Sequence, residues 1–243
     1  MICSSGIGFD PIWNGERLTF GFHGIWQGVA VLYDRKTSSL WLHSTGECID
    51  GPLKGAKLEP ISGRHVQWEE WKRDHPGTQV MAPVGELQER YFPEESAKRG
   101  NTYFPRGFPP TIQNVDRRLS PSALCYGINA GKAARAYPFE VMATVEGGVI
   151  NDKIGDRAVV ISFDRKSGSA AGHARQLDGE TLVFARSEEG LLRDTTSGSI
   201  FNLDGLSISG PLKGRQLPRV FGLQAEWYGW FATYPETTIY KSP

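Results

Sequence analysis

Short apolar runs separated by turn residues dominate the first part of the chain. The runs at 17–22, 28–33 and 39–43 are rich in aromatic and aliphatic residues, and Asn-Gly, Arg-Lys-Thr and Thr-Gly-Glu segments adjoin them. Runs of this length between turn residues are typical of β-strands. Asn-Gly at 14–15 and Asp-Gly at 178–179 favour tight hairpins, because both central positions of such a turn need positive φ.

The second half continues this pattern and adds few helices. The runs at 124–128 and 133–137 flank an Asn-Ala-Gly turn, and 158–163 predicts a buried strand. Two Trp-x-x-Trp motifs place their tryptophans on one helical face shortly before a proline. Short helices are therefore predicted over 66–75, 224–234 and, after a proline suited to a first helical turn, 138–143.

An internal repeat is the clearest signal in the sequence. The pentapeptide GPLKG begins at Gly51 and again at Gly210, 159 positions later. Agreement at one fixed spacing does not arise by chance in a chain of this size, and it predicts two related modules. We expect the repeated tryptophans to be buried anchors of both modules. The further pairs at this spacing are Leu58 and Leu217, Trp68 and Trp227, Trp71 and Trp230, and Pro76 and Pro235.

The first copy starts later than the second. With small shifts, 14–16 matches 178–180 and 3–6 matches 167–170, whereas the stretch 124–166 has no partner in the first copy. The first module should then expose an unpaired edge or an apolar patch where these elements belong. The predicted organisation is an N-terminally incomplete first module over 1–82, a proline-rich linker over 83–121, and a complete but degenerate second module over 122–243.

These patterns predict a mainly β (α+β) fold. Each module is expected to be a twisted antiparallel sheet or partial barrel with a short Trp-x-x-Trp helix. At 243 residues with 39% hydrophobic positions, the chain has enough apolar material for one or two cores.

Charge and hydropathy narrow the range of partners. Lysine plus arginine equals aspartate plus glutamate at 27 each, and nucleic-acid binding domains normally carry a basic surplus. No apolar run approaches the roughly 20 residues of a membrane-spanning helix. We therefore expect no nucleic acid and no membrane span. A small molecule or protein ligand, a strand-donating partner and a homo-oligomer remain open.

The residues that follow Met1 lack the basic start and apolar stretch of a signal peptide. Taken as given, the sequence predicts a cytoplasmic protein. If the first module is truncated, an extracytoplasmic location is expected instead.

Reactive side chains are concentrated in the first copy. The second copy has Ser, Asn, Leu, Gln or Tyr where the first copy has Cys or His. If only one module is functional, the first is favoured. The candidate pocket residues are His23, Asp34, Arg35, Trp41, His43 and Cys48.

Three of the reactive residues form a candidate metal or thiol site. Cys3, His43 and Cys48 could bind copper or zinc, or supply a thiolate with a histidine base. No pair among them has metal-ligand spacing, and packing is the favoured interpretation. Three cysteines allow at most one disulfide, and three reduced thiols are an equally good interpretation.

Several segments resemble a known family. GERLTFGFHG, YDRKTSSLWLHSTGECIDGPLKG, AARAYPFEVM, VINDKIG and EWYGWFATYPET are similar to segments of the bacterial and archaeal family called "domain of unknown function 3179". The resemblance covers nearly the whole chain and implies that family's fold, but no activity. It also implies a C-x-x-C motif of which Cys3 would be the second cysteine, the first being absent.

Two functions are compatible with these features. The first is a binding or structural module with a single pocket in the first copy. The second is a metal- or thiol-dependent enzyme of redox type that uses Cys3, His43 and Cys48. Whether the protein is an enzyme is left open by the sequence.

Overall fold

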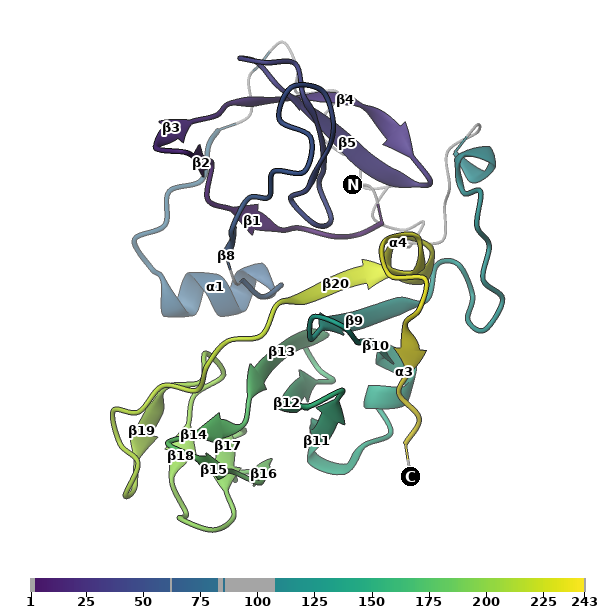
Figure 1. Ribbon diagram of the computed structural model, residues 1–243. Coiled ribbons are helices and arrows are strands. Elements are labelled where there is room, and N and C mark those ends of the chain that lie inside the picture. Colours follow the sequence, from purple (N-terminus) through teal and green to yellow (C-terminus); the bar gives the residue numbers. More distant parts are fainter. Residues whose placement is uncertain (1–2, 62, 83–84, 86–107, 243) are drawn as a thin grey trace.

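The computed structural model describes residues 3–61, 63–82, 85 and 108–242. The fold is mainly β, and among these residues it has several antiparallel sheets, none of which closes into a barrel. Figure 1 shows two β-rich bodies with helix α1 and strand β20 between them. In chain order the first body comprises β1 (Gly8–Phe9), β2 (Ile12–Trp13), β3 (Glu16–Arg17), β4 (Phe20–Trp26), β5 (Val29–Asp34), β6 (Leu40–Leu42), β7 (Cys48–Asp50), β8 (Pro60–Ile61) and α1 (Trp68–Asp74).

The second body contains more strands. After the 3-10 turn η2 (Pro109–Thr111) its elements are β9 (Leu124–Asn129), β10 (Ala134–Pro138), α3 (Phe139–Met142), η3 (Glu146–Gly148), β11 (Val149–Ile154), β12 (Arg157–Asp164), β13 (Ser169–Ala174), β14 (Gln176–Leu177), β15 (Glu180–Thr181), β16 (Phe184–Arg186), β17 (Leu192–Asp194), β18 (Ile200–Phe201), β19 (Ser207–Ser209), β20 (Gly222–Glu226), α4 (Trp227–Thr233) and β21 (Thr238–Ile239). The predicted hairpin at 124–137 and the buried strand at 158–163 are confirmed as β9–β10 and β12.

The two modules share one strand register. The sheet β4-β5-β6-β7 has the same order as β16-β17-β18-β19. Phe20 pairs with Asp34 as Phe184 pairs with Asp194. Further along, Trp41 pairs with Cys48 as Phe201 pairs with Ser207, and both sheets have a bulge beside that pair. The internal repeat thus extends from sequence identity to backbone pairing.

The turn before β6 is also repeated. Asp34 accepts hydrogen bonds from the backbone N–H of Thr37 and Ser39, and Asp194 accepts one from Ser197 N–H. At the next turn, Gly51 and Gly210 have φ of 91° and 86°, and a Cβ at either would lie within 3 Å of a serine Cα. Only glycine allows both the positive φ and the close approach to the serine backbone, which explains why the glycine that begins GPLKG recurs.

Both predicted Trp-x-x-Trp helices form, although the second begins only at Trp227 because 224–226 belong to strand β20, and their internal contacts match. Trp71 Nε1 donates to Thr78 Oγ1 at 2.8 Å, and Trp230 Nε1 donates to Thr237 Oγ1 at 2.9 Å. The indole rings of Trp71 and Trp230 also stack on the aromatic ring four residues later, His75 and Tyr234. The helix conformation is therefore encoded locally.

The prediction that the tryptophans of both helices are buried was wrong for the first module. Trp227 and Trp230 are 1% and 0% exposed, but Trp68 and Trp71 are 52% and 41% exposed. In the second module β9 packs under α4, and a Cβ on Gly127 of β9 would lie 2.3 Å from the Trp230 ring. Among the described residues, the first module has no counterpart of β9, so Trp68 and Trp71 face solvent.

The modules meet through the N-terminal segment and α4. Cys3 N donates to Tyr228 Oη at 2.6 Å, and Glu226 N donates to Cys3 O at 2.8 Å. A Cβ on Gly229 would lie 2.4 Å from Cys3 Cβ, so the backbones approach closely here. Near α1, Ser169 Oγ donates to His65 O at 2.7 Å.

Candidate functional site

The structure brings Cys3 and His43 together through Ser5. His43 Nε2 lies 2.9 Å from Ser5 Oγ and 3.8 Å from Cys3 Sγ, and Ser5 Oγ lies 3.0 Å from Cys3 Sγ. On its other side, His43 Nδ1 lies 3.1 Å from both the backbone N and O of Ala30. Both ring nitrogens are partnered, so the imidazole orientation is fixed.

The protonation states at this cluster disfavour ionic chemistry at neutral pH. Burial raises the pKa of the Cys3 thiol to about 11, and the nearby Glu226 carboxyl adds to the shift, whereas the Ser5 hydrogen bond opposes it. Burial also lowers the pKa of His43. The pair is therefore a neutral thiol and a neutral imidazole, not a thiolate and an imidazolium.

Cys48 lies in a different environment, in β7. Its Sγ donates to Asp50 O at 3.3 Å, and burial raises the pKa of its thiol. No group of three or more His, Cys, Asp or Glu side chains that could hold a metal ion occurs in the described part of the chain. The three cysteines are free and buried.

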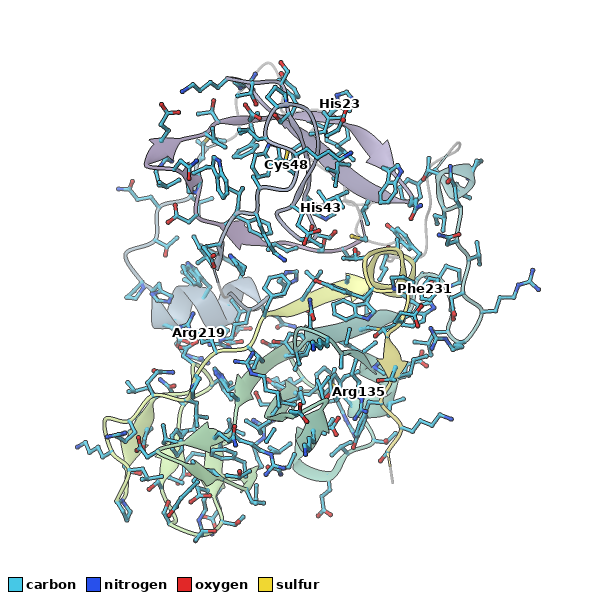
Figure 2. The ribbon with its side chains drawn as sticks, in the orientation of Figure 1. His23, His43, Cys48, Arg135, Arg219 and Phe231 are labelled. Carbon is cyan, nitrogen blue, oxygen red and sulfur yellow. The ribbon has the colours of Figure 1, made fainter. Side chains whose placement is uncertain are left out.

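The remaining candidate pocket residues lie in the sheet β4-β5-β6-β7 or directly beside it. Asp34 is fully buried and accepts a hydrogen bond from Trp41 Nε1 at 3.1 Å. His23 is exposed in β4 at a register shift, and Arg35 is exposed and donates to Tyr33 Oη at 3.1 Å. In Figure 2, His23 lies at the outer side of the first module and His43 lies nearer the second.

A cavity of about 190 Å³ lies within the first module. Among the described residues its wall is apolar apart from the imidazole of His43, which is the one titratable side chain there. Of the candidate pocket residues, the structure places Trp41 and His43 on this wall. The lining residues are Phe9, Pro11, Phe20, Leu32, Trp41, Leu42, His43, Gly46 and Leu58.

A second cavity, of about 260 Å³, lies between the modules and was not predicted from the sequence. Its lining residues from the first module lie within 63–75 and include Arg64, Glu70 and Trp71. The lining residues from the second module include His173. The charges partly neutralise one another, since Arg64 pairs with Glu70 at 2.8 Å and with Asp204 at 3.6 Å.

His173 was missed by the sequence analysis. Its Nε2 donates to Leu203 O at 3.0 Å, while Nδ1 is buried against Gly205 without a hydrogen-bond partner among the described residues. Burial lowers its pKa, so the ring is neutral at pH 7. In the first module, Phe9 packs against Gly46 as His173 packs against Gly205. Continuing the match of 3–6 with 167–170 would have paired Phe9 with His173 and singled out His173 as a place where the two copies differ.

A third, open groove of about 640 Å³ lies within the second module around Arg186. The Arg186 guanidinium donates to the carbonyls of Gly147, Phe163 and Gly190 and is thereby engaged. Cavities thus occur in both modules and between them, and the expectation that the functional pocket is in the first module stays a prediction.

The architecture defines a duplicated, mainly β protein with one strand-poor and one strand-rich module. Its sequence from 1 to 237 matches the family model described as "protein of unknown function (DUF3179)". The chain belongs to that family. No curated protein and no solved structure matches it. Within the described residues, no helix is long and apolar enough to cross a membrane.

Proposed function

We propose that the protein is a binding protein whose first module takes an apolar group into the 190 Å³ cavity beside His43. The observation that supports this most is the apolar wall of this cavity, which opens to solvent on one side. Ligand pockets are typically concave, lined mainly by apolar side chains and provided with few polar groups.

His43 is the polar group on the cavity wall. Its imidazole is neutral and engaged by Ser5 and Ala30, so a bound group would gain a hydrogen bond from it only by displacing the Ser5 hydroxyl, while the wall provides dispersion contacts. Aromatic side chains add to that wall, with Phe20 and Trp41 in an edge-to-face pair whose ring centroids are 5.8 Å apart.

Toluene and indole are suitable probes, since both match a cavity of this size. Each should raise the melting temperature in a concentration-dependent way, because a ligand that binds only the folded state stabilises it. The variant Leu42→Trp should reduce the shift by narrowing the cavity.

Asn202→Trp is the matched control, since Asn202 holds the place of Leu42 in the second module beside Phe201. This variant should retain the full ligand-induced shift. An equal loss in both variants, or no shift with either probe in the unaltered protein, would contradict a cavity site in the first module.

The alternative, an enzyme that uses Cys3, His43 and Cys48, receives less support from the geometry. A thiolate nucleophile or redox thiol needs a depressed pKa, and burial raises the pKa of all three cysteine thiols, to about 11 for Cys3 and about 12 for Cys125.

We therefore expect the folded protein to react with less than one equivalent of Ellman's reagent at pH 7.5 within minutes. After unfolding in guanidinium chloride, three equivalents should react, matching the three cysteines. Rapid labelling of one thiol in the folded protein, lost in Cys3→Ser, would favour the enzyme hypothesis instead.

A further inference from the structure

In the second module, the place of the first-module cavity is filled by a strand. Val160 of β12 is fully buried in a core cluster with aliphatic and aromatic residues of β16, β17 and β18 and their neighbours. The other buried members of this cluster are Leu182, Phe184, Leu192, Phe201 and Leu217.

Four of those residues have counterparts on the first-module cavity wall. By strand register, Phe20, Leu32 and Trp41 hold the places of Phe184, Leu192 and Phe201. By the 159-residue spacing, Leu58 holds the place of Leu217. The cavity therefore lies where Val160 packs in the second module, and β12 has no counterpart among the described residues of the first.

The backbone beside the cavity supports the same correspondence. In the second module, the Asn151 side chain of β11 donates to Phe184 O at 2.7 Å and accepts from Phe184 N at 2.9 Å. The first module has Phe20 at this place. Arg35 N donates to Thr19 O, and bonded pairs alternate along an antiparallel ladder, so the N–H and C=O of Phe20 point away from β5.

One hairpin supplies both contacts in the second module. Asn151 of β11 and Val160 of β12 are direct cross-strand partners, so the amide and the valine come from adjacent positions. Strand β12 also pairs with β13, whose first-module counterpart includes β1. Among the described residues β1 pairs only with β8, which leaves its other edge without a strand.

We propose that the first module is an acceptor for a β-hairpin from another polypeptide, with an asparagine on one strand opposite a valine-sized apolar residue on the other. This deepens the proposed function and rests on it, because the apolar residue would occupy the same cavity. Main-chain pairing along β1 would add affinity, as in other strand-addition complexes.

A second copy of this chain is a poor donor. Its own β12 is the central strand of the three-stranded sheet β11-β12-β13, and Val160 is fully buried there. Lending that hairpin would require the second module to open. A separate polypeptide carries no such cost.

The test uses the folded protein labelled with ¹⁵N and a synthetic peptide with the sequence of residues 147–166, the hairpin of the second module. Saturable binding should shift the backbone amide of Phe20 and the indole N–H of Trp41. The amide of Phe184, which Asn151 already engages, should not move.

Two altered peptides serve as matched controls, one with alanine for the asparagine and one with aspartate for the valine that corresponds to Val160. Each should weaken binding by at least tenfold, because the first removes the pairing with Phe20 and the second places a charge in an apolar cavity. Equal binding of all three peptides would overturn the proposal.

The remaining outcomes separate the two proposals. If toluene or indole stabilises the protein but no peptide binds, the hairpin proposal fails and the cavity function stands. If neither binds, both fail. Concentration-dependent dimers in which the hairpin of one chain enters another would replace the separate polypeptide by a second copy and overturn the proposal in its stated form.

Discussion

Two buried aspartates hold equivalent turns, one in each module. Asp34 and Asp194 are both fully buried and each accepts hydrogen bonds from the turn that follows it. Asp34 also accepts a hydrogen bond from the indole N–H of Trp41, whereas Phe201 at the matching place has no such donor. Burial opposes ionisation of Asp34, but hydrogen bonds from Thr37 and Trp41 outweigh it and lower the pKa of the carboxyl.

Asp34→Asn should therefore destabilise the protein by about 1–3 kcal/mol at pH 7. Because the folded pKa lies below the unfolded value, the stabilisation is fully present above the unfolded pKa and is lost as the pH falls through the folded pKa. The difference in unfolding free energy between wild type and variant should shrink below about pH 4.

Urea unfolding at pH 7, 5 and 3 measures this difference. Arg35→Ala, which alters the exposed neighbour, should follow the wild type at every pH within about 0.5 kcal/mol. A constant gap between wild type and Asp34→Asn from pH 7 to pH 3 would show that the carboxylate charge is not involved.

The residue four positions after each aspartate has the same left-handed backbone conformation in both modules, but it is serine in the first and glycine in the second. Ser38 and Gly198 have φ of 60° and 73°, and each N–H donates to the aspartate carbonyl. A left-handed conformation costs a non-glycine residue about 1–2 kcal/mol. The second module avoids this cost with glycine and the first does not.

Gly198→Ala should lower stability by about 1 kcal/mol, and Ser38→Gly should leave it unchanged or raise it. Nothing lies within 4 Å of a Cβ at Gly198, so the effect would come from backbone conformation alone. Thermal unfolding of both variants tests this. Loss of stability in Ser38→Gly would indicate a role for the serine hydroxyl.

At the scale of elements, the two Trp-x-x-Trp helices show what a covering strand contributes. Helices α1 and α4 share their hydrogen bonds and ring contacts, yet α1 has no buried residue and α4 has four. The helical conformation follows from local sequence, whereas burial depends on β9 and the neighbouring strands.

Trp227→Ala should cost about 3–5 kcal/mol, the usual range for a large buried aromatic residue. Trp68→Ala, at the equivalent but exposed position, should cost less than about 1 kcal/mol. Chemical unfolding of the two variants provides the comparison. Equal losses would mean that Trp68 is covered in solution.

This contrast also shows how far the sequence could predict the structure. The repeat predicted two related modules and the Trp-x-x-Trp spacing predicted both helices, because glycine turns and aromatic spacing act locally. The sequence also indicated that the first copy lacks a partner for 124–166, the stretch that includes β9. Trp68 was nevertheless expected to be buried because it matches Trp227, and the missing strand outweighs that match. The sequence could not show that Cys3 approaches His43 while Cys48 bonds to Asp50, because that separation arises when the sheet folds.

At the scale of the molecule, the contact between Cys3 and α4 is one of those that join the modules. A methyl group at Gly229 would lie 2.4 Å from Cys3 Cβ. Gly229→Ala should therefore displace the N-terminal segment, although alanine in a helix interior is otherwise favourable by about 1 kcal/mol. We expect faster hydrogen exchange at residues 3–9 and a net loss of about 1–3 kcal/mol.

The double variant Cys3→Gly with Gly229→Ala separates a steric clash from other effects. Cys3 has a φ of 47°, which glycine adopts readily, and its removal makes room for the alanine methyl. The two substitutions should be clearly non-additive in unfolding free energy. Additive effects would show that the segment does not rest on Gly229.

The bond from Cys3 N to Tyr228 joins residues 225 positions apart, and this has a consequence for synthesis on the ribosome. At about 5–20 residues per second, Cys3 leaves the exit tunnel roughly 10–50 s before Tyr228 is available. Domains usually fold in the order in which they are made. Here the first module emerges first but completes its contacts last, after α4 has formed. Throughout that interval the N-terminal segment lacks its partner in α4, so the first module stays incomplete while the rest of the chain is made.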